Sequence, residues 1–474
     1  MSETAKHIGI IGGGLSGAAL CIALLRINRP GMVLHLIEPE ALPGGGIAYG
    51  LAAPWHSLNV TADRASLEPD DPDHWWQWAA IHGPQIDFPE TASANAESFL
   101  PRKLFGIYAA ALLHEAEMRS AGPRLMRHHA RVDALSRHAG GFRLQLSDGA
   151  LLECGKVVLA VGALPVPGLN LPGLDEARAQ GRVFDNPWDI DALARIDTQA
   201  RVVIAGTGLT MADSVLSLRR QGHQGEIVAV SRHGVVPARR SLARPSLASP
   251  SLARPGAPVL DAQSEAPRLS QLLNQLRRGA REAPSGDWQE AIESLRPVTR
   301  ILWQRLDDAA RRRFVRHART FWDAHRFRMP PDTAAELQAD LDAGRLRMVK
   351  GRFSAVAADA KGLQIALRRR GQAETEMLQA GALLLCTGPR HGSGQDDAEA
   401  RLLQNLHRSG LIRPDACGMG LDADADGGLL GSDGKAVQGF YSLGPPLRGM
   451  RLECTAITDI RNQAVELAQL LAGV

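Results

Sequence analysis

Three glycines near the N-terminus have the spacing required to bind a dinucleotide. Gly12, Gly14 and Gly17 lie between a short apolar run and a segment rich in Ala and Leu. In such a turn the first glycine permits a tight bend, the second lets the backbone approach a pyrophosphate, and the third lets the helix pack closely on the strand. The unpaired N–H groups at the start of the helix would then face the anion.

Glu38 completes this pattern. It follows the next apolar run, 32–37, at a position where a carboxylate would accept hydrogen bonds from an adenosine ribose and would repel a ribose phosphate. The alternative is a structural glycine turn that binds nothing. The sequence of strand, turn, helix, strand and acid favours the dinucleotide site.

A second, less complete glycine turn occurs in the middle of the chain. Gly206 and Gly208 follow another apolar run and precede Thr210, but Met211 stands where the pattern prefers glycine or alanine, so this helix should ride slightly higher on its strand. Arg232 replaces the acid after the next strand. A guanidinium there suits a ribose 2′-phosphate and favours NADPH over NADH, whereas the alternative is an arginine on a solvated loop.

Two dinucleotide turns in one chain predict that hydride passes from an exchanged cofactor to a stored one. No catalytic acid, base or nucleophile can be assigned, and none is required where a cofactor carries the chemistry. His56 and His325 could act as bases or could be structural. The histidines show no metal-ligand spacing, so no metal site is predicted, and His128-His129 indicates a surface turn.

Apolar periodicity predicts the elements that hold these turns. Strands are expected at 7–11, 32–37, 157–161, 202–205, 226–230, 348–355, 363–368, 382–385 and 441–443. Helices are expected from each glycine turn to about 27 and 220, around 75–78, and at 104–118 and 455–471. The Arg-rich segment 268–328 is expected to be helical, with one apolar face made by Leu302, Leu306, Ala310, Phe314, Ala318 and Phe321.

Prolines mark two interruptions in this pattern. Pro330-Pro331 should end the Arg-rich helical segment. Three prolines within 241–255 predict an exposed loop.

The order of the elements predicts an α/β fold with two Rossmann-like dinucleotide-binding domains, the second inserted in the first. The first domain would comprise 1–193 and 394–474. The second would comprise 194–393 and carry a helical insertion at about 260–330.

Composition excludes several classes of protein. The chain has 474 residues, 45% of them apolar, and a formal net charge of +3, which is too small to indicate nucleic-acid binding. No apolar stretch approaches the roughly 18 residues of a membrane span. Five scattered cysteines without a C-x-x-C pair predict reduced thiols in the cytoplasm and argue against a disulfide relay. The oligomeric state is not predicted.

Further motifs accompany the two glycine turns. They are Gly46–Tyr49, His56–Val60, Val161-Gly162, Pro101–Tyr108, Gly206–Asp213, Ser231–Gly234, Thr387-Gly388, and Gly444–Gly449 followed by Thr455–Arg461. Through these motifs nearly the whole chain resembles the bacterial FAD/NAD(P)-binding protein family. That family is similar to flavoproteins of the glutathione-reductase-like fold and is related to class B flavin monooxygenases.

The resemblance implies positions for FAD. The adenosine would lie at the first glycine turn and Glu38, with the Val132 backbone beside the adenine. The flavin ring would lie near Tyr49, Leu58 and Asn59, with Arg102 close by. The remaining implied cofactor positions are Gly162, Gly444 and the N-terminus of the helix that starts near Thr455. Where many relatives of the wider fold carry Gly-Asp, Pro445 follows Gly444, so that flavin contact must come from elsewhere.

The wider resemblance implies an NADPH-dependent flavin monooxygenase acting with O₂ on a small molecule. The Baeyer–Villiger signature F-x-G-x-x-x-H-x-x-x-W is missing, because the corresponding region 184–188 reads FDNPW. N- or S-oxygenation or hydroxylation is therefore expected. Two alternatives stay open: an NAD(P)H-dependent flavin reductase or dehydrogenase without oxygen insertion, and a non-catalytic dinucleotide-binding sensor or scaffold.

Overall fold

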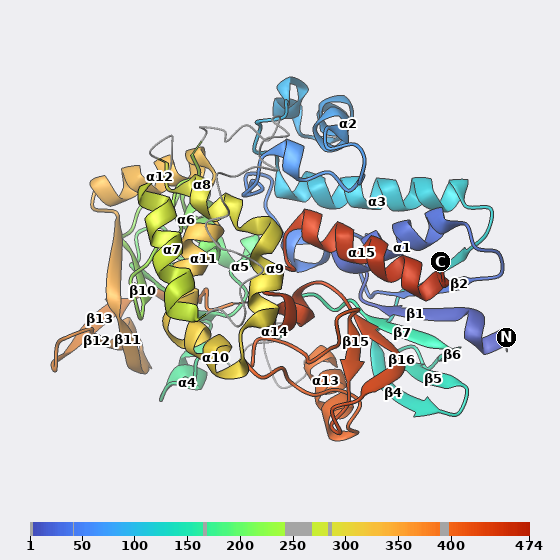
Figure 1. Ribbon diagram of the computed structural model, residues 1–474. Coiled ribbons are helices and arrows are strands. Elements are labelled where there is room, and N and C mark those ends of the chain that lie inside the picture. The colour runs from blue at the N-terminus through green and yellow to red at the C-terminus, as the bar shows by residue number, and fades with distance from the viewer. Residues whose placement is uncertain (1–2, 41, 165–167, 242–267, 283–286, 389–397) are drawn as a thin grey trace.

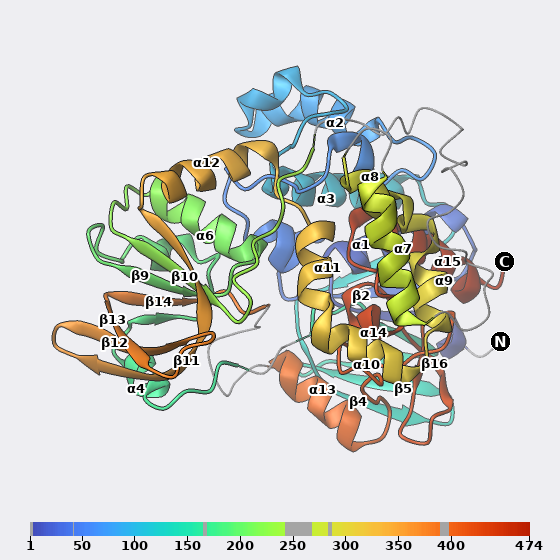
Figure 2. The same cartoon turned by 60° about the vertical axis from the view of Figure 1, so that its left-hand side comes forward.

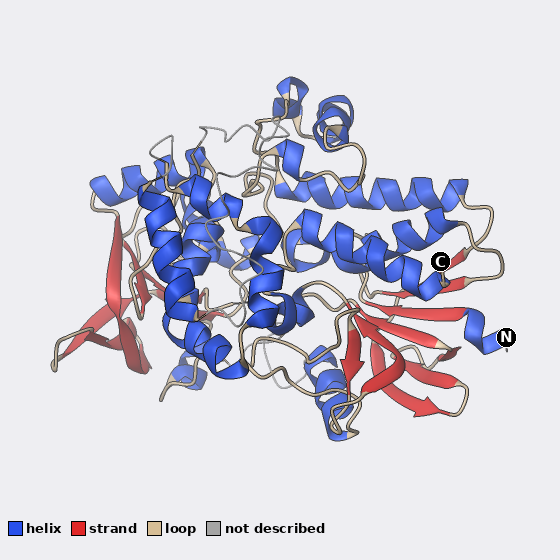
Figure 3. Ribbon diagram, viewed as in Figure 1, coloured by secondary structure: helices blue, strands red, loops and turns tan. Residues whose placement is uncertain are grey.

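Two sheets rich in parallel strands form the framework of the protein. The computed structural model describes residues 3–40, 42–164, 168–241, 268–282, 287–388 and 398–474. The strands gather into two groups at opposite ends of the molecule, with helices between them (Figure 3). This arrangement confirms the predicted α/β fold.

The first sheet is built from both ends of the chain. Its strand order is β15-β16-β7-β1-β2-β3, and every neighbouring pair except β15·β16 is parallel. The strands are β1 (His7–Ile11), β2 (Val33–Ile37), β3 (Arg124–His128), β7 (Lys156–Leu159), β15 (Gly428–Leu430) and β16 (Ala436–Ser442). Because β1 pairs with both β2 and β7, the first glycine turn emerges at the centre of the sheet.

Helices cover one face of this sheet and a small antiparallel sheet covers the other. One apolar core joins the sheet to α1 (Leu15–Ile27), α3 (Arg102–Arg119) and α15 (Ile457–Ala472), and includes the fully buried Trp75 of α2 (His74–His82). A second core joins it to the meander β4 (Val132–His138), β5 (Gly141–Leu146) and β6 (Leu151–Cys154), beside α13 (Ala398–Arg408). Figure 1 shows α1, α3 and α15 side by side above the strands.

The second sheet has the order β13-β12-β11-β10-β9-β14-β8. Its strands are β8 (Val183–Phe184), β9 (Val202–Ala205), β10 (Ile227–Ser231), β11 (Leu346–Asp359), β12 (Gly362–Arg369), β13 (Thr375–Ala380) and β14 (Ala382–Leu385). Helices α6 (Leu209–Arg220) and α12 (Pro331–Asp342) pack on one face, with α5 (Ile190–Leu193) beside α6, while α4 (Leu174–Ala179) packs on the other. β8 belongs to this sheet although it precedes the predicted boundary at residue 193, so the sheets divide between β7 and β8.

The helical insertion consists of five described helices that pack on the first domain. They are α7 (Leu269–Arg281), α8 (Gln289–Ser294), α9 (Arg296–Arg305), α10 (Asp308–His317) and α11 (Arg319–Arg326). Trp303 donates its indole N–H to the backbone O of Gly449, at 2.7 Å, within the short α14 (Arg448–Arg451). Figure 2 shows α9, α10 and α14 stacked in front of the first sheet.

The prediction of one apolar face across 302–321 is wrong. Leu306 and Phe314 share a buried cluster, but Leu302 joins another and Phe321 is 44% exposed. The segment is broken into three helices at residues 306–307 and 318, so a spacing of 3.6 residues does not persist across it.

The prediction that Pro330-Pro331 ends a helix is also wrong. Helix α11 ends earlier, at Arg326, and Pro331 is the first residue of α12. The first position of a helix needs no hydrogen-bonded N–H, so proline is tolerated there. The predicted loop at 241–255 lies, after Ser241, outside the described residues. None of the described helices combines the length and apolar composition needed to cross a bilayer.

His128 ends β3 and does not lie in the predicted surface turn. It belongs to a row of three histidines that crosses the first sheet. His7 Nδ1 lies 2.8 Å from His35 Nε2, and His35 Nδ1 lies 3.0 Å from His128 Nε2, with one residue from each of β1, β2 and β3. Burial, followed by the neighbouring imidazoles of His128 and His7, lowers the pKa of His35 to about 4. His35 is therefore neutral in the folded protein at neutral pH.

The histidine row predicts a loss of stability in mild acid. His35 binds a proton less readily when folded, so the free energy of unfolding should fall as the pH drops below about 6.5 toward 4. After allowance for solvent screening we expect about 1 kcal/mol between pH 7 and pH 5 from this side chain. Urea unfolding of the wild type and of His35→Gln at both pH values measures it. An equal pH dependence in the two proteins would contradict the assignment.

Candidate functional site

The first glycine turn requires glycine at two of its positions for reasons of packing. Gly12 has φ +101°, and a Cβ there would lie 2.6 Å from Ala160 O. A Cβ on Gly17 would overlap Gly12 O, because α1 lies directly against the turn. These are the tight bend and the close helix–strand approach that the spacing predicted.

Gly14 has a different environment. It is the N-cap of α1, it has no side-chain cap, and a Cβ there would meet only Gly46 Cα, at 3.6 Å. The first N–H groups of α1 therefore face an open space between the turn and the loop 44–50. A pyrophosphate fits this space, because the site offers unpaired donors and no side chain.

The predicted adenosine residues stand at the same edge of the sheet. Glu38 follows β2, and its Oε2 accepts a hydrogen bond from Gly13 N at 2.6 Å. Val132 opens β4 and is buried, while Gly162 follows β7 with φ +73°. Since β2 and β7 flank β1, Glu38 and Gly162 lie on either side of the first turn. Their contacts with FAD remain predictions.

Three further residues were expected near the flavin ring, and the first of them, Tyr49, belongs to the loop that covers the first glycine turn. Tyr49 packs its ring on Phe105 at 5.1 Å, and burial raises the pKa of Tyr49. Leu58 is buried, and the backbone carbonyl of Asn59 accepts a hydrogen bond from Arg240 Nε at 3.1 Å.

Two further positions expected near FAD come from the C-terminal part of the chain. Gly444 has φ +75°, and a Cβ there would lie 2.5 Å from Ser16 Oγ, at the start of α1. Its N–H donates to Gln463 Oε1 at 3.1 Å. Thr455 precedes α15, which begins at Ile457.

Arg102 connects the two domains. Its Nη2 lies 2.6 Å from Asp213 Oδ2 on α6, and the two side chains are only 19% and 13% exposed. Trp188 Nε1 donates to the same carboxylate oxygen at 3.5 Å. The proximity to the flavin implied for Arg102 remains a prediction, because this ion pair already holds one end of its guanidinium.

His56 reinforces the same interface and is structural in this geometry. It is completely buried; its Nδ1 accepts a hydrogen bond from Ala53 N at 3.1 Å, and its Nε2 lies 2.9 Å from Ser217 Oγ. Burial lowers the pKa of His56, so the ring is neutral. Both ring nitrogens are therefore engaged, which argues against a role as a base. His325 likewise bonds Phe321 O through its Nδ1, at 2.7 Å.

Arg102 and Asp213 both lie in motifs found in the sequence, but the sequence does not reveal that they contact each other. The available signal was the pattern of α6, where Asp213 and Ser217 lie one turn apart on a helix that is otherwise largely buried. Polar residues at this spacing on a buried face indicate a polar partner. The partner, Arg102, is more than a hundred residues away in sequence, and so only the fold identifies it.

A buried ion pair that the sequence did not reveal ties the helical insertion to the segment before α15. Arg326 donates to both carboxylate oxygens of Glu453, at 3.0 and 2.9 Å, and both side chains are 6% exposed. The preceding Leu452 has φ +55°, and Glu453 N bonds Arg451 O at 2.6 Å. This strained turn aims Glu453 at the insertion.

The second glycine turn repeats the geometry of the first. Gly206 has φ +121°, and a Cβ there would overlap Cys386 O. Gly208 is the N-cap of α6, and a Cβ there would meet no atom within 4 Å. Thr210 lies in the first turn of α6, and Met211 is buried in the core beneath it. The N-terminus of α6 is therefore open to an anion, as that of α1 is.

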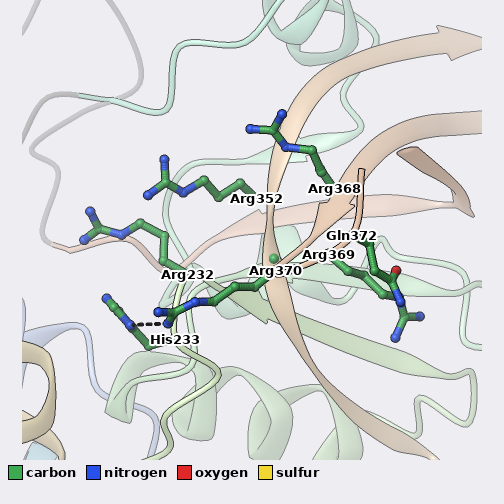
Figure 4. A pocket seen from close by; sticks show the side chains of 9 residues that line it. Arg232, His233, Arg352, Arg368, Arg369, Arg370 and Gln372 are labelled. Carbon is green, nitrogen blue, oxygen red and sulfur yellow. Dashed lines mark hydrogen bonds between the residues drawn. The ribbon is translucent and has the colours of Figure 1, made fainter. Parts of the chain in front are cut away.

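Arg232 follows β10 and lines an open pocket of about 390 Å³. Figure 4 shows its side chain beside those of Arg352, Arg368 and Arg370, with His233 below. The pocket thus lies at the carboxyl end of the strand that follows the second glycine turn. This is the position at which the ribose of a dinucleotide is read in a Rossmann fold.

Comparison with known proteins agrees with this geometry. Residues 9–164 match a protein family described as FAD-NAD(P)-binding. No curated protein sequence matches the chain significantly. The match confirms the resemblance to FAD/NAD(P)-binding flavoproteins over the segment that holds the first glycine turn, Glu38 and Val132.

Solved structures with the same fold cover almost the whole chain. The ornithine N-hydroxylase of Kutzneria sp. 744 has a TM-score of 0.64 at 15% identity, and the L-lysine 6-monooxygenase of Pseudomonas syringae has 0.62 at 16%; each comparison covers 98% of both chains. The thioredoxin reductase of Lactococcus lactis has 0.52 at 12%, covering 98% of this chain and 97% of that one. These likenesses confirm the fold with two dinucleotide-binding domains.

The two open N-caps predict separable defects. Gly14→Val should fold and be purified without flavin colour, because the side chain fills the space above α1. Gly208→Val should stay yellow but no longer be reduced by NADPH, because its side chain fills the matching space above α6. Absorbance of the purified variants, before and after NADPH is added without air, measures both. A fully yellow Gly14→Val protein would remove the FAD site from this turn.

The contact between the domains predicts an energetic coupling. A double-mutant cycle with Arg102→Met and Asp213→Asn should give a coupling of about 1–2 kcal/mol in the free energy of unfolding, because either single change leaves a half-buried charge alone. The exposed pair Glu115–Arg119 on α3 is the control and should give about 0.3–0.5 kcal/mol. Additive effects at Arg102 and Asp213 would show that the pair does not hold the domains.

Proposed function

We propose that the chain is an FAD-dependent oxidoreductase that is reduced by NADPH and that oxygenates a small molecule. The observation that carries the proposal is the placement of the two open helix N-termini. Within two turns of Gly208, Asp213 of α6 contacts Arg102 through its carboxylate and His56 through its backbone carbonyl. A dinucleotide bound at the N-terminus of α6 would therefore start next to the contacts that join the two domains.

The residues of the first domain fit FAD. Gly14 leaves room for the pyrophosphate, Glu38 is placed for the ribose, and the loop 44–50 covers the turn through a bond from Gly44 N to Gly13 O of 2.7 Å. FAD, when bound, would accept hydride from NADPH and deliver electrons to O₂. The role of the protein is to bind and orient the two dinucleotides and to shield them from water.

The contact between the two domains orients the second domain relative to the first. Arg102 is the first residue of α3, and its backbone N–H donates to His56 O at 2.7 Å, so the two residues of the first domain that contact α6 are joined to each other. Because the pair is half-buried, it fixes the approach of the second domain and keeps water from this part of the interface.

For the substrate we propose a small amine that is oxygenated at nitrogen. The ornithine and lysine enzymes support this choice through their fold alone, since their identity to this chain is 15% and 16%. The missing Baeyer–Villiger signature agrees with oxygenation of a heteroatom. We also propose that the protein acts in the cytoplasm, because all five cysteines are free thiols.

A reductase that does not insert oxygen is the second candidate, and the likeness to a thioredoxin reductase favours it. The thiols argue against the disulfide relay of such enzymes. Four of the five are buried, and burial raises the pKa of Cys21, Cys154, Cys386 and Cys454 to about 12. Thiols held protonated are poor electron relays. Such a reductase would therefore pass electrons to an organic acceptor.

Anaerobic stopped-flow mixing with each nicotinamide, followed by turnover in air, tests the proposal. We expect NADPH to bleach the flavin absorbance much faster than NADH does, and O₂ consumption to rise with a suitable amine, with one oxygenated product per NADPH. Gly208→Val is the control, because it should keep the flavin and lose the bleaching.

Two other outcomes of this experiment would favour the two alternative functions. Bleaching by NADPH without any oxygenated product across a panel of diamines and amino acids would favour the reductase. No bleaching by either nicotinamide, with both still binding, would favour a non-catalytic dinucleotide sensor or scaffold.

A further inference from the structure

Four arginines of the second sheet are gathered at one pocket without acidic partners. Arg232 follows β10, whereas Arg352, Arg368 and Arg370 come from the hairpin of β11 and β12. All four are exposed, and none forms an ion pair with any carboxylate in the part of the chain that the structure describes. Other arginines of this domain do have such partners: Arg201 and Arg347 with Glu226, Arg219 with Asp340, and Arg369 with Glu376.

The strand register forces these charges together. Arg352 and Arg368 are directly opposite each other across β11 and β12, and like charges in that relation destabilise a hairpin. Arg370 follows the end of β12, two residues beyond Arg368, and its guanidinium lies against His233 at the same pocket. Ser231, the last residue of β10, pairs with Lys350 of β11, and Arg232 follows it directly and lines the same pocket as the hairpin arginines.

The surroundings of His233 show the same concentration of positive charge. Its Nδ1 accepts a hydrogen bond from Arg370 Nη1 at 3.2 Å, which requires a neutral ring. Burial lowers the pKa of His233, and Arg370, Arg232, Lys350 and Arg352 lower it further. An anion bound in the pocket would offset the repulsion among these groups.

We propose that Arg352, Arg368 and Arg370 join Arg232 to bind the 2′-phosphate of NADPH, and that the β11–β12 hairpin thereby determines the choice of NADPH over NADH. The pocket is large enough for a phosphorylated ribose, and it lies where an adenosine half extending from the N-terminus of α6 would end. One guanidinium can bind two phosphate oxygens, and several guanidinium groups together can bind all the free oxygens of a phosphate. The inference rests on the proposed function only in naming NADPH as the reductant.

Arg369 is the matched control. It lies between Arg368 and Arg370 in sequence, but it points to the opposite face and pairs with Glu376 at 2.7 Å. Figure 4 shows its guanidinium beside Gln372, on the other side of the strand from Arg232, Arg352, Arg368 and Arg370. Arg369 borders the same pocket, but Glu376 holds its guanidinium on the other face of the strand. Removing it therefore takes away the same charge from the same hairpin and leaves in place the four guanidinium groups that we assign to the phosphate.

The test is calorimetric titration of the FAD-loaded protein with adenosine 2′,5′-bisphosphate, with adenosine 5′-monophosphate and with inorganic phosphate. Arg352→Ala, Arg368→Ala and Arg370→Ala should each weaken the bisphosphate about tenfold and leave the monophosphate within about twofold. Arg369→Ala should change neither. The thermal midpoint of Arg352→Ala without ligand should be equal to or above that of the wild type, since a repulsive pair is removed.

Three results would overturn the inference: equal weakening by Arg369→Ala, no weakening by any hairpin variant, or inorganic phosphate that binds as tightly as the bisphosphate. The proposed function fails separately. If the bisphosphate binds in the arginine-dependent manner but NADPH never bleaches the flavin, the site stands and the oxidoreductase does not. If NADPH bleaches the flavin and the hairpin variants bind normally, the oxidoreductase stands and the site does not.

Discussion

The half-buried ion pair between Arg102 and Asp213 is the contact on which the arrangement of the two domains depends. Each domain could fold around its own sheet, but a reaction that passes hydride between two dinucleotides needs them to meet. Asp213 lies one turn beyond the start of α6, and Arg102 is the first residue of α3. The pair therefore joins the beginning of one cofactor-facing helix to the domain that holds the other, and His56 and Ser217 add a neutral hydrogen bond beside it.

The arginines of this chain show how burial decides what a cation can do. Arg326 is almost fully buried and shares both carboxylate oxygens of Glu453, so its charge serves to attach the helical insertion. Arg102 is half-buried and keeps one acidic partner at the interface. The four pocket arginines are exposed and have no acid among the described residues, so their charge is available to a ligand. The same residue type thus serves attachment, orientation and binding according to its surroundings.

The local pattern of the sequence predicted the parts of the fold that depend on local chemistry. Gly12 and Gly17 mark a turn because any side chain there would collide with the backbone, and this constraint is visible in the spacing of the glycines. The path of the helical insertion was not predictable in this way. Its apolar residues face two clusters and solvent, since the insertion packs on the first domain, and the 3.6-residue period does not survive two breaks. Pro331 shows the same limit, because a proline can begin a helix as well as end one.

The residues of the candidate site also fall into two groups, those that local sequence predicts and those that only the fold brings together. The glycine turns, Glu38 and Arg232 have signatures within a few residues, whereas the partners of Arg102 and of the hairpin arginines are set by strand register and domain packing. Arg352 and Arg368 are 16 positions apart in sequence and become neighbours only through an antiparallel hairpin. Their repulsion is a property of the sheet, and a reading of the sequence that treats each arginine separately does not find it.

The central claim is that one chain binds two different dinucleotides at the same time. Native mass spectrometry of the FAD-loaded protein with excess NADP⁺ tests this most directly, because it counts the bound molecules without requiring turnover. The account predicts a species with one FAD and one NADP⁺ per chain, and loss of only the NADP⁺ in Gly208→Val. A protein that never carries more than one dinucleotide, or that releases FAD as NADP⁺ binds, would contradict it.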